Sequence, residues 1–244
     1  MTRRLRLHAT CAAIAFACSL PWMVATQGTQ GAVAIDADDI GGVVTGTQGP
    51  EAGVWVIAET TDLPTKFARI VVTDDQGRYV LPDMPRATYN VWVRGYGLVD
   101  SPRVLGVPGT RLDLAAVVAP TPQAAAQYYP PNYWLSVMKL PDGPGRQRAA
   151  GIARCGLACH QMGGKATREI SPETIATLGP FESTADAWLR RVRSGPSGAM
   201  MSGYYGQIGP TLYPAWTDAI LAGAVPKQPP RPRGVERNLV VSVW

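Results

Sequence analysis

The chain has 244 residues, of which 46% are hydrophobic and 17% are charged, and its formal net charge is +5. This length allows two small domains. The basic residues are scattered and no basic stripe alternates with aromatic residues, so the composition argues against a nucleic-acid surface. Four cysteines and two histidines limit the metal and nucleophile chemistry of the chain.

The first 34 residues have the pattern of a secretory signal peptide. Three arginines among the first six residues precede an apolar run from Ala9 to Ala25, and Ala32-Val33-Ala34 fits a small-residue cleavage site. We predict a signal peptide over 1–34, cleaved after Ala34 or, alternatively, after Ala25. An uncleaved anchor is the competing interpretation, but the run is short for a membrane span.

Cleavage has consequences for charge and for location. Loss of Arg3, Arg4 and Arg6 lowers the formal charge to +2, so the high isoelectric point belongs partly to the leader. The mature protein is then expected to be periplasmic or secreted, without a stable membrane anchor. Its whole complement of cysteine and histidine would be Cys155, Cys159 and His160.

Residues 35–119 predict a small all-β sandwich. The β-branched runs Val54–Ile57 and Arg69–Val72 and the alternating segment Tyr89–Val93 indicate strands, with Gly-, Pro- and Asp-rich turns between them. Short strands at regular spacing are typical of such a sandwich.

Five stretches of this segment follow a familiar pattern: Gly42-Val43-Val44, Pro50 to Val56, Thr73 to Tyr79, Leu81 to Pro85 and Tyr89 to Val93. With these stretches the segment resembles the carboxypeptidase regulatory-like domain, a transthyretin-like sandwich. The resemblance implies the fold and, for function, a spacer or adhesion module. Asp74, Asp75 and Asp83 raise the alternative of a calcium site, but aspartates at turns ordinarily shape the turn itself.

Residues 120–145 are rich in proline and tyrosine and predict a linker. We expect the linker to be packed rather than free, because its aromatic side chains are costly to leave in water. The aromatic residues concerned are Tyr128, Tyr129, Tyr133 and Trp134.

Residues 146–225 predict a small all-α domain of three or four helices. The segment Gln147–Gln161 carries the two cysteines, and Ser183 has the pattern of a cap for a helix that ends at Gly195. A further helix is expected over Thr211–Gly223, where Pro214 is tolerable because it falls in the first turn. The core is thin for so small a unit, and a bound apolar macrocycle would add to it.

Cys155, Cys159 and His160 form the most specific chemical motif of the chain. Two thiols beside one imidazole are the groups that attach a c-type haem, each thiol to a vinyl group and the histidine to iron. The usual motif has two residues between the cysteines, whereas this one has three. On a helix, that spacing still leaves both thiols on one face, about 40° apart.

Other cysteine chemistry fits the motif less well. A structural zinc site and an iron–sulfur cluster each require four ligands, and the mature chain offers three residues. A thioredoxin-like site has two intervening residues at a strand-to-helix turn. A disulfide between Cys155 and Cys159 stays open as an alternative, because exported proteins meet an oxidising compartment, but it leaves His160 unexplained.

The helical region resembles class I cytochromes c, in which an axial methionine lies on a loop after the haem helix. The resemblance implies Met201 as the second iron ligand, with Met200 as the alternative, on a glycine-rich loop over 197–203. A methionine that simply fills the core is the competing interpretation. Lys165 and Arg168 are interpreted as solvated surface charges rather than as partners of the haem propionates.

Four further stretches match a larger pattern: His160 to Gly163, Lys165 to Ile170, Trp216-Thr217-Asp218 and Pro229 to Asn238. With them the mature chain resembles secreted bacterial proteins that join a regulatory-like sandwich, a cytochrome c-like domain and a β-propeller related to streptogramin lyase. The resemblance implies that residues 226–244 form a proline-rich tail and the start of a possible missing domain, and the apolar run Leu239–Trp244 is expected to be a strand without a partner.

The predicted class is therefore multidomain, an all-β transthyretin-like sandwich followed by a small all-α cytochrome c-like domain. The predicted function is an exported monohaem c-type cytochrome module for periplasmic electron transfer. We expect an electron carrier rather than a catalyst, whose partner is a periplasmic redox protein or dehydrogenase. The alternatives are a secreted binding or scaffold protein with a Cys155–Cys159 disulfide, and the front part of a larger propeller-containing enzyme.

Overall fold

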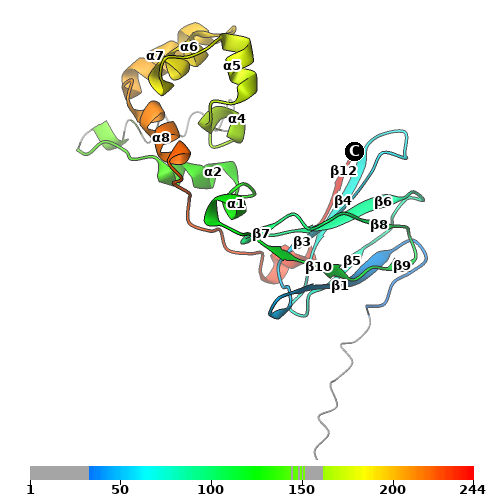
Figure 1. Cartoon of the computed structure of the whole chain (residues 1–244). Coiled ribbons are helices and arrows are strands. Elements are labelled where there is room, and N and C mark those ends of the chain that lie inside the picture. The colour runs from blue at the N-terminus through cyan, green and yellow to red at the C-terminus, as the bar shows by residue number, and fades with distance from the viewer. Residues whose placement is uncertain (1–32, 144, 148, 150, 152–161) are drawn as a thin grey trace, which may run out of the picture. The chain divides into compact units, whose positions relative to one another are not determined.

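The computed structural model describes residues 33–143, 145–147, 149, 151 and 162–244 (Figure 1). Almost all of the predicted signal peptide, and the predicted haem-attachment residues Cys155, Cys159 and His160, lie outside the described residues. Residues 32–244 belong to one compact unit, and the account below concerns the described part of that unit.

The first sheet is built around strand β1 (Ile40–Gly46). Strand β1 pairs antiparallel with β2 (Gly49–Pro50) and β5 (Arg78–Leu81), and parallel with β9 (Thr110–Arg111) and β10 (Leu114–Ala115). The tight turn before β5 depends on Gly77, whose φ of +71° is a conformation that other residues rarely adopt.

The second sheet has the strand order β12-β4-β3-β6-β8 (Figure 1). Every pair in it is antiparallel, and a separate two-stranded ribbon joins β7 (Leu98–Val99) to β11 (Val117–Val118). The three predicted runs are confirmed as strands β3, β4 and β6. The members of the large sheet are β3 (Trp55–Thr60), β4 (Phe67–Val72), β6 (Tyr89–Arg94), β8 (Val104–Gly106) and β12 (Val240–Val243).

The two sheets enclose a shared apolar core, which we call the sandwich core. Residues that alternate along the strands point into it, such as Val56 and Ala58 of β3 and Val91 and Val93 of β6, which are fully buried. Strand β1 contributes from the opposite sheet. The other members include Val54, Phe67, Val71, Tyr79, Leu81, Met84, Tyr89 and Leu98.

Residues 145–147, 149 and 151 are helical, and nine further helices and 3-10 turns lie between β11 and β12 in the described part of the chain. They are α1 (Pro122–Ala126), α2 (Pro131–Trp134), η1 (Leu135–Val137), α4 (Lys165–Arg168), α5 (Pro172–Leu178), α6 (Thr184–Arg193), α7 (Gly198–Ile208), α8 (Leu212–Leu221) and η2 (Gly234–Asn238).

Two of these helices confirm predictions made from capping and periodicity. The hydroxyl of Ser183 accepts a hydrogen bond from the backbone N–H of Asp186, which caps α6, and the chain turns away at Gly195 with a φ of +79°. Helix α8 begins after Thr211, and Pro214 lies in its first turn as expected.

The helices pack around a second apolar cluster, the helical core, which is dominated by aromatic side chains. Trp134 and Trp216 are each 1% exposed and lie at its centre. The expectation that the linker aromatics would be packed is confirmed for Trp134 and Tyr129. The remaining buried members are Ala125, Ala126, Met138, Ala149, Met162, Trp188, Val192, Tyr205, Leu212 and Tyr213.

The predicted fold class, separate all-β and all-α domains, is wrong, because one compact unit mixes helix and strand. The linker residues 125–138 are part of the helical core, and Tyr96 and Ala119 from the strand region pack against it. After the helices, the chain returns to the sandwich as β12. Contacts of this kind depend on residues far apart in the sequence, which composition along the chain does not indicate.

The apolar C-terminal run was expected to be a strand without a partner, and this prediction is also wrong. Strand β12 pairs antiparallel with β4, with Val241 opposite Ile70. This pairing satisfies the backbone groups along the free side of β4, which would otherwise be an exposed edge.

Within the described ranges, the structure contains no helix that is both long enough and apolar enough to cross a membrane. The helices there are short, and the longest, α7, has 11 residues.

Two glycines in the helical part are expected to respond oppositely to alanine. A Cβ on the buried Gly163 would overlap the backbone carbonyl of Pro131, whereas a Cβ on the exposed Gly203 of α7 meets nothing. We expect Gly163→Ala to lower the free energy of unfolding by about 1–3 kcal/mol, and Gly203→Ala to raise it by about 0.5–1 kcal/mol. Urea unfolding measures both, and equal effects would contradict the described packing of Gly163.

Candidate functional site

The segment that carries the predicted haem-attachment residues is joined on both sides to buried residues of the helical core. Ala149 and Met162, which lie before and after that segment, are each 3% exposed and belong to the core. The positions of Cys155, Cys159 and His160 are outside the described residues, so the site is built here from what surrounds the segment.

The structure places the two candidate iron-binding methionines on a helix, so the predicted loop over 197–203 is wrong. Helix α7 begins at Gly198, directly after Ser197. The glycines of this stretch suggested a loop, but buried Tyr205 and partly buried Ile208 pack α7 against the helical core, and packing overrides weak helix propensity.

The two methionines differ in their surroundings. Met201 is partly buried and packs against the helical core, whereas Met200 is 50% exposed. Because Met201 faces the helical core, its position favours it over Met200 as the iron ligand. Ligation of iron by Met201 stays a prediction. Met162, which follows His160 by two residues in the sequence, is buried in the same core.

Arg168 is the most unusual residue near the segment, because it is charged and almost fully buried. Only 4% of its side chain is exposed, so the expectation of a solvated surface charge is wrong for Arg168, while Lys165 is exposed as expected. Its guanidinium carbon lies 3.8 Å from the centre of the Trp134 ring. Stacking a guanidinium on an indole face is favourable, particularly away from water.

Two further contacts hold the Arg168 guanidinium. Its Nη1 donates a hydrogen bond of 2.9 Å to the carbonyl oxygen of Gly163, and its Nη2 lies 3.2 Å from Oε1 of Glu169. Burial lowers the pKa of Arg168, and Glu169 acts in the opposite direction. Because the ordinary pKa of arginine is above 12, the group stays charged.

The backbone of α4 is fixed by a second set of polar contacts from α6 and α8. Arg191 donates two hydrogen bonds of 2.8 Å, to the carbonyl oxygens of Thr167 and Glu169. The hydroxyl of Thr217 donates to the carbonyl oxygen of Arg168 at 3.0 Å and accepts from Nε1 of Trp188 at 2.9 Å. This network determines where Arg168 lies.

Two buried nitrogen donors at this position have no hydrogen-bond partner among the described residues, Nε of Arg168 and Nε1 of Trp134. A buried donor without an acceptor costs about 1–3 kcal/mol, so this arrangement favours an acceptor group beside the stacked pair. The charge of Arg168 is already paired with Glu169, so the site lacks acceptor atoms rather than a counter-charge. We call Arg168 and Trp134 with their two unpaired donors the Arg168–Trp134 site.

The sequence analysis expected Trp134 to be packed but assigned it to no site, and it interpreted Arg168 as a surface charge. The signal in the sequence that could have indicated this site was a tryptophan in a proline-rich segment, since the N–H of a buried indole needs a hydrogen-bond acceptor. Nothing local in the sequence shows that an arginine eight residues after a histidine will be buried.

The aspartates considered for calcium act within turns or in an ion pair. The carboxylate of Asp74 accepts hydrogen bonds from the N–H groups of Gln76 and Arg78. Burial raises the pKa of Asp74, but these bonds and the Arg78 side chain outweigh it and lower the pKa. Asp75 pairs with Arg237. In the described part of the chain, no three His, Cys, Asp or Glu residues are grouped to hold a metal.

The chain was compared with protein-family models and with curated proteins, and neither comparison gives a match.

Replacement of Arg168 tests how much its side chain contributes to the free energy of unfolding. We expect Arg168→Met to lower the free energy of unfolding by about 2–4 kcal/mol, because it removes charged hydrogen bonds to Gly163 and Glu169 and the stacking on Trp134. Arg168→Lys should lower the free energy of unfolding by a smaller amount than Arg168→Met, since an ammonium keeps the charge but cannot form the planar fork of a guanidinium.

The matched control for this test is Arg190→Met, at an exposed position of α6, with an expected change within about 0.5 kcal/mol. Chemical denaturation followed by tryptophan fluorescence measures all three variants. An Arg168→Met protein as stable as the control would contradict the buried network.

Proposed function

We propose that this chain is an exported electron carrier with one c-type haem. The observation that carries the proposal is the sequence Cys155-Gly-Leu-Ala-Cys159-His160, whose segment is joined to the helical core at Ala149 and Met162. In this proposal Cys155 and Cys159 form the thioether bonds and His160 ligates the iron. The haem supplies reversible one-electron transfer between ferrous and ferric iron.

The described residues fit such a group at two points. The Arg168–Trp134 site offers two unpaired donors, one of them on a guanidinium that is also paired with Glu169, and such donors suit the oxygens of a haem carboxylate. The core-facing Met201 offers a thioether as the second iron ligand, and the exposed Met200 is the alternative. The aromatic helical core would exclude water around the macrocycle.

Each residue then has a distinct task. Nε of Arg168 and Nε1 of Trp134 would donate hydrogen bonds to a buried haem carboxylate, and the Trp134 ring fixes the plane of the guanidinium. If Met201 and His160 both held the iron, the thioether would raise the reduction potential relative to a second histidine. Such a protein would exchange electrons with a periplasmic redox protein or dehydrogenase.

Covalent haem attachment is the first prediction of this proposal. Protein exported in a host with c-type haem maturation should give a c-type pyridine haemochrome spectrum and a haem stain that survives denaturing electrophoresis. The matched control is Cys155→Ser with Cys159→Ser, which should lose the stain. A colourless wild-type protein with a Cys155–Cys159 disulfide would contradict the proposal and favour a disulfide-bridged binding module.

The second iron ligand is tested by replacing each methionine separately. Met201→Ala in the haem-loaded protein should remove the far-red absorption band of sulfur bonded to ferric haem. It should also lower the potential by on the order of 0.1 V, within the roughly 0.8 V range that axial ligands span.

Met200→Ala is the control and should change neither the band nor the potential, because Met200 is half exposed. Loss of the band in Met200→Ala alone would assign Met200 as the ligand. A band that persists in both variants would contradict methionine ligation.

A further inference from the structure

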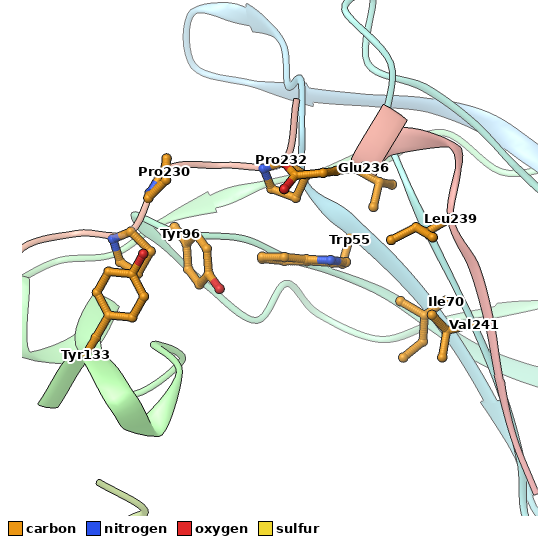
Figure 2. A pocket seen from close by; sticks show the side chains of 11 residues that line it. Trp55, Ile70, Tyr96, Tyr133, Pro230, Pro232, Glu236, Leu239 and Val241 are labelled. Atoms are coloured by element: carbon orange, nitrogen blue, oxygen red, sulfur yellow. The ribbon is translucent and has the colours of Figure 1, made fainter. Parts of the chain in front are cut away.

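A pocket of about 360 Å³ lies on the outer face of the large sheet, on the side away from the sandwich core (Figure 2). Trp55 and Val72 alternate with the inward-facing Val56 and Val71, so they point outward from the sheet. Residues 226–233, which we call the C-terminal strap, cover part of this face. The lining residues are Trp55, Ile70, Val72, Tyr96, Tyr133, Pro229, Pro230, Pro232, Glu236, Leu239 and Val241.

The strap is held in place by two arginines that are not among the lining residues. Arg231 pairs with Glu51 at 2.6 Å and donates to the carbonyl oxygen of Tyr96 at 3.1 Å. Arg237 pairs with Asp75 and donates to the carbonyl oxygen of Pro232 at 3.0 Å. The pocket is therefore built in the free protein, and both guanidinium charges are neutralised by carboxylates.

Aromatic rings at right angles form one corner of the pocket. The ring centres of Trp55 and Tyr96 are 4.9 Å apart, with planes at 77°. Figure 2 shows Tyr133 on the far side of Tyr96 from Trp55. Burial raises the pKa of Tyr96, and the charge of a nearby Tyr133 phenolate would add to this, so Tyr96 is a neutral phenol near neutral pH. The faces of such rings carry partial negative charge.

Glu236 is the one lining residue with a formal charge. Its Oε2 accepts a hydrogen bond of 2.9 Å from the backbone N–H of Arg233, and no ion pair to a Lys or Arg side chain is formed by Glu236 within the described residues. Neither lysine nor arginine lines the pocket. The electrostatic character of the pocket is therefore negative, which disfavours anions.

We propose that this pocket binds a small quaternary ammonium compound. The positive charge is delocalised over N-methyl groups, which can contact aromatic faces, prolines and aliphatic side chains without losing strong hydrogen bonds to water. Perpendicular aromatic walls with one acidic residue are the arrangement that recognises such cations. A primary ammonium would lose more hydration on entering the same apolar walls, and a neutral ligand would gain nothing from Glu236.

The experiment uses choline and its neutral tert-butyl analogue, in which carbon replaces the ammonium nitrogen. Isothermal titration calorimetry on the full chain should show choline binding about tenfold more tightly than the analogue, because only choline gains the cation–π and carboxylate attraction. Equal affinity for the two compounds, or no binding of choline, would overturn the proposal.

Two variants test the residues. Glu236→Gln, at an exposed position, should weaken choline binding about fivefold and leave binding of the neutral analogue unchanged. Trp55→Leu should weaken choline binding at least tenfold. The matched control is Glu182→Gln, an exposed carboxylate that does not line the pocket.

Circular dichroism checks that each variant is folded, and if Trp55→Leu is not, Glu236→Gln alone decides. Choline binding that is unaffected by Glu236→Gln would overturn the proposal, as would a neutral saccharide that binds where choline does not.

Discussion

The stacking of Arg168 on Trp134 is the contact on which the helical part of the molecule depends. A buried guanidinium must be paired and hydrogen-bonded, or its desolvation is not offset. It therefore requires the carbonyl group of Gly163, the carboxylate of Glu169 and the indole face at once. Trp134 belongs to α2, in the segment predicted to be a linker, and Arg168 belongs to α4. The stacked guanidinium therefore connects that segment to the helices that follow it.

Contacts of Trp134 and Tyr96 show why the fold does not divide into a strand domain and a helix domain. The carbonyl group of Trp134 accepts a hydrogen bond from Nε1 of Trp216, so α2 is fixed to α8 as well. Tyr96, in the loop after β6, packs against the helical core and also lines the pocket above the sheet. The proposed haem region and the proposed cation pocket thus draw on one continuous set of aromatic residues.

Local signals in the sequence predicted local structure correctly. The β-branched runs at β3 and β4 and the cap at Ser183 depend only on neighbouring residues, and the structure confirms them. The failures share one cause, which is packing between distant segments. The glycines around Met201 predicted a loop, but the packing of Tyr205 in the helical core holds this stretch in α7. No residue near Val241 in the sequence indicates that it pairs with Ile70. An arginine such as Arg168 is ordinarily exposed, so its burial follows only from Trp134 and Gly163.

The return of the C-terminal segment to the sandwich also constrains the order of folding. Arg231 and Glu51 form an ion pair across a separation of 180 residues, and β12 completes the edge of a sheet whose other strands come from the first half of the chain. Closing so long a loop carries an entropic cost before the new contacts form. During synthesis, the side of β4 that β12 will cover is therefore exposed until Val240–Val243 emerge, and a chaperone that shields this edge would act during that interval.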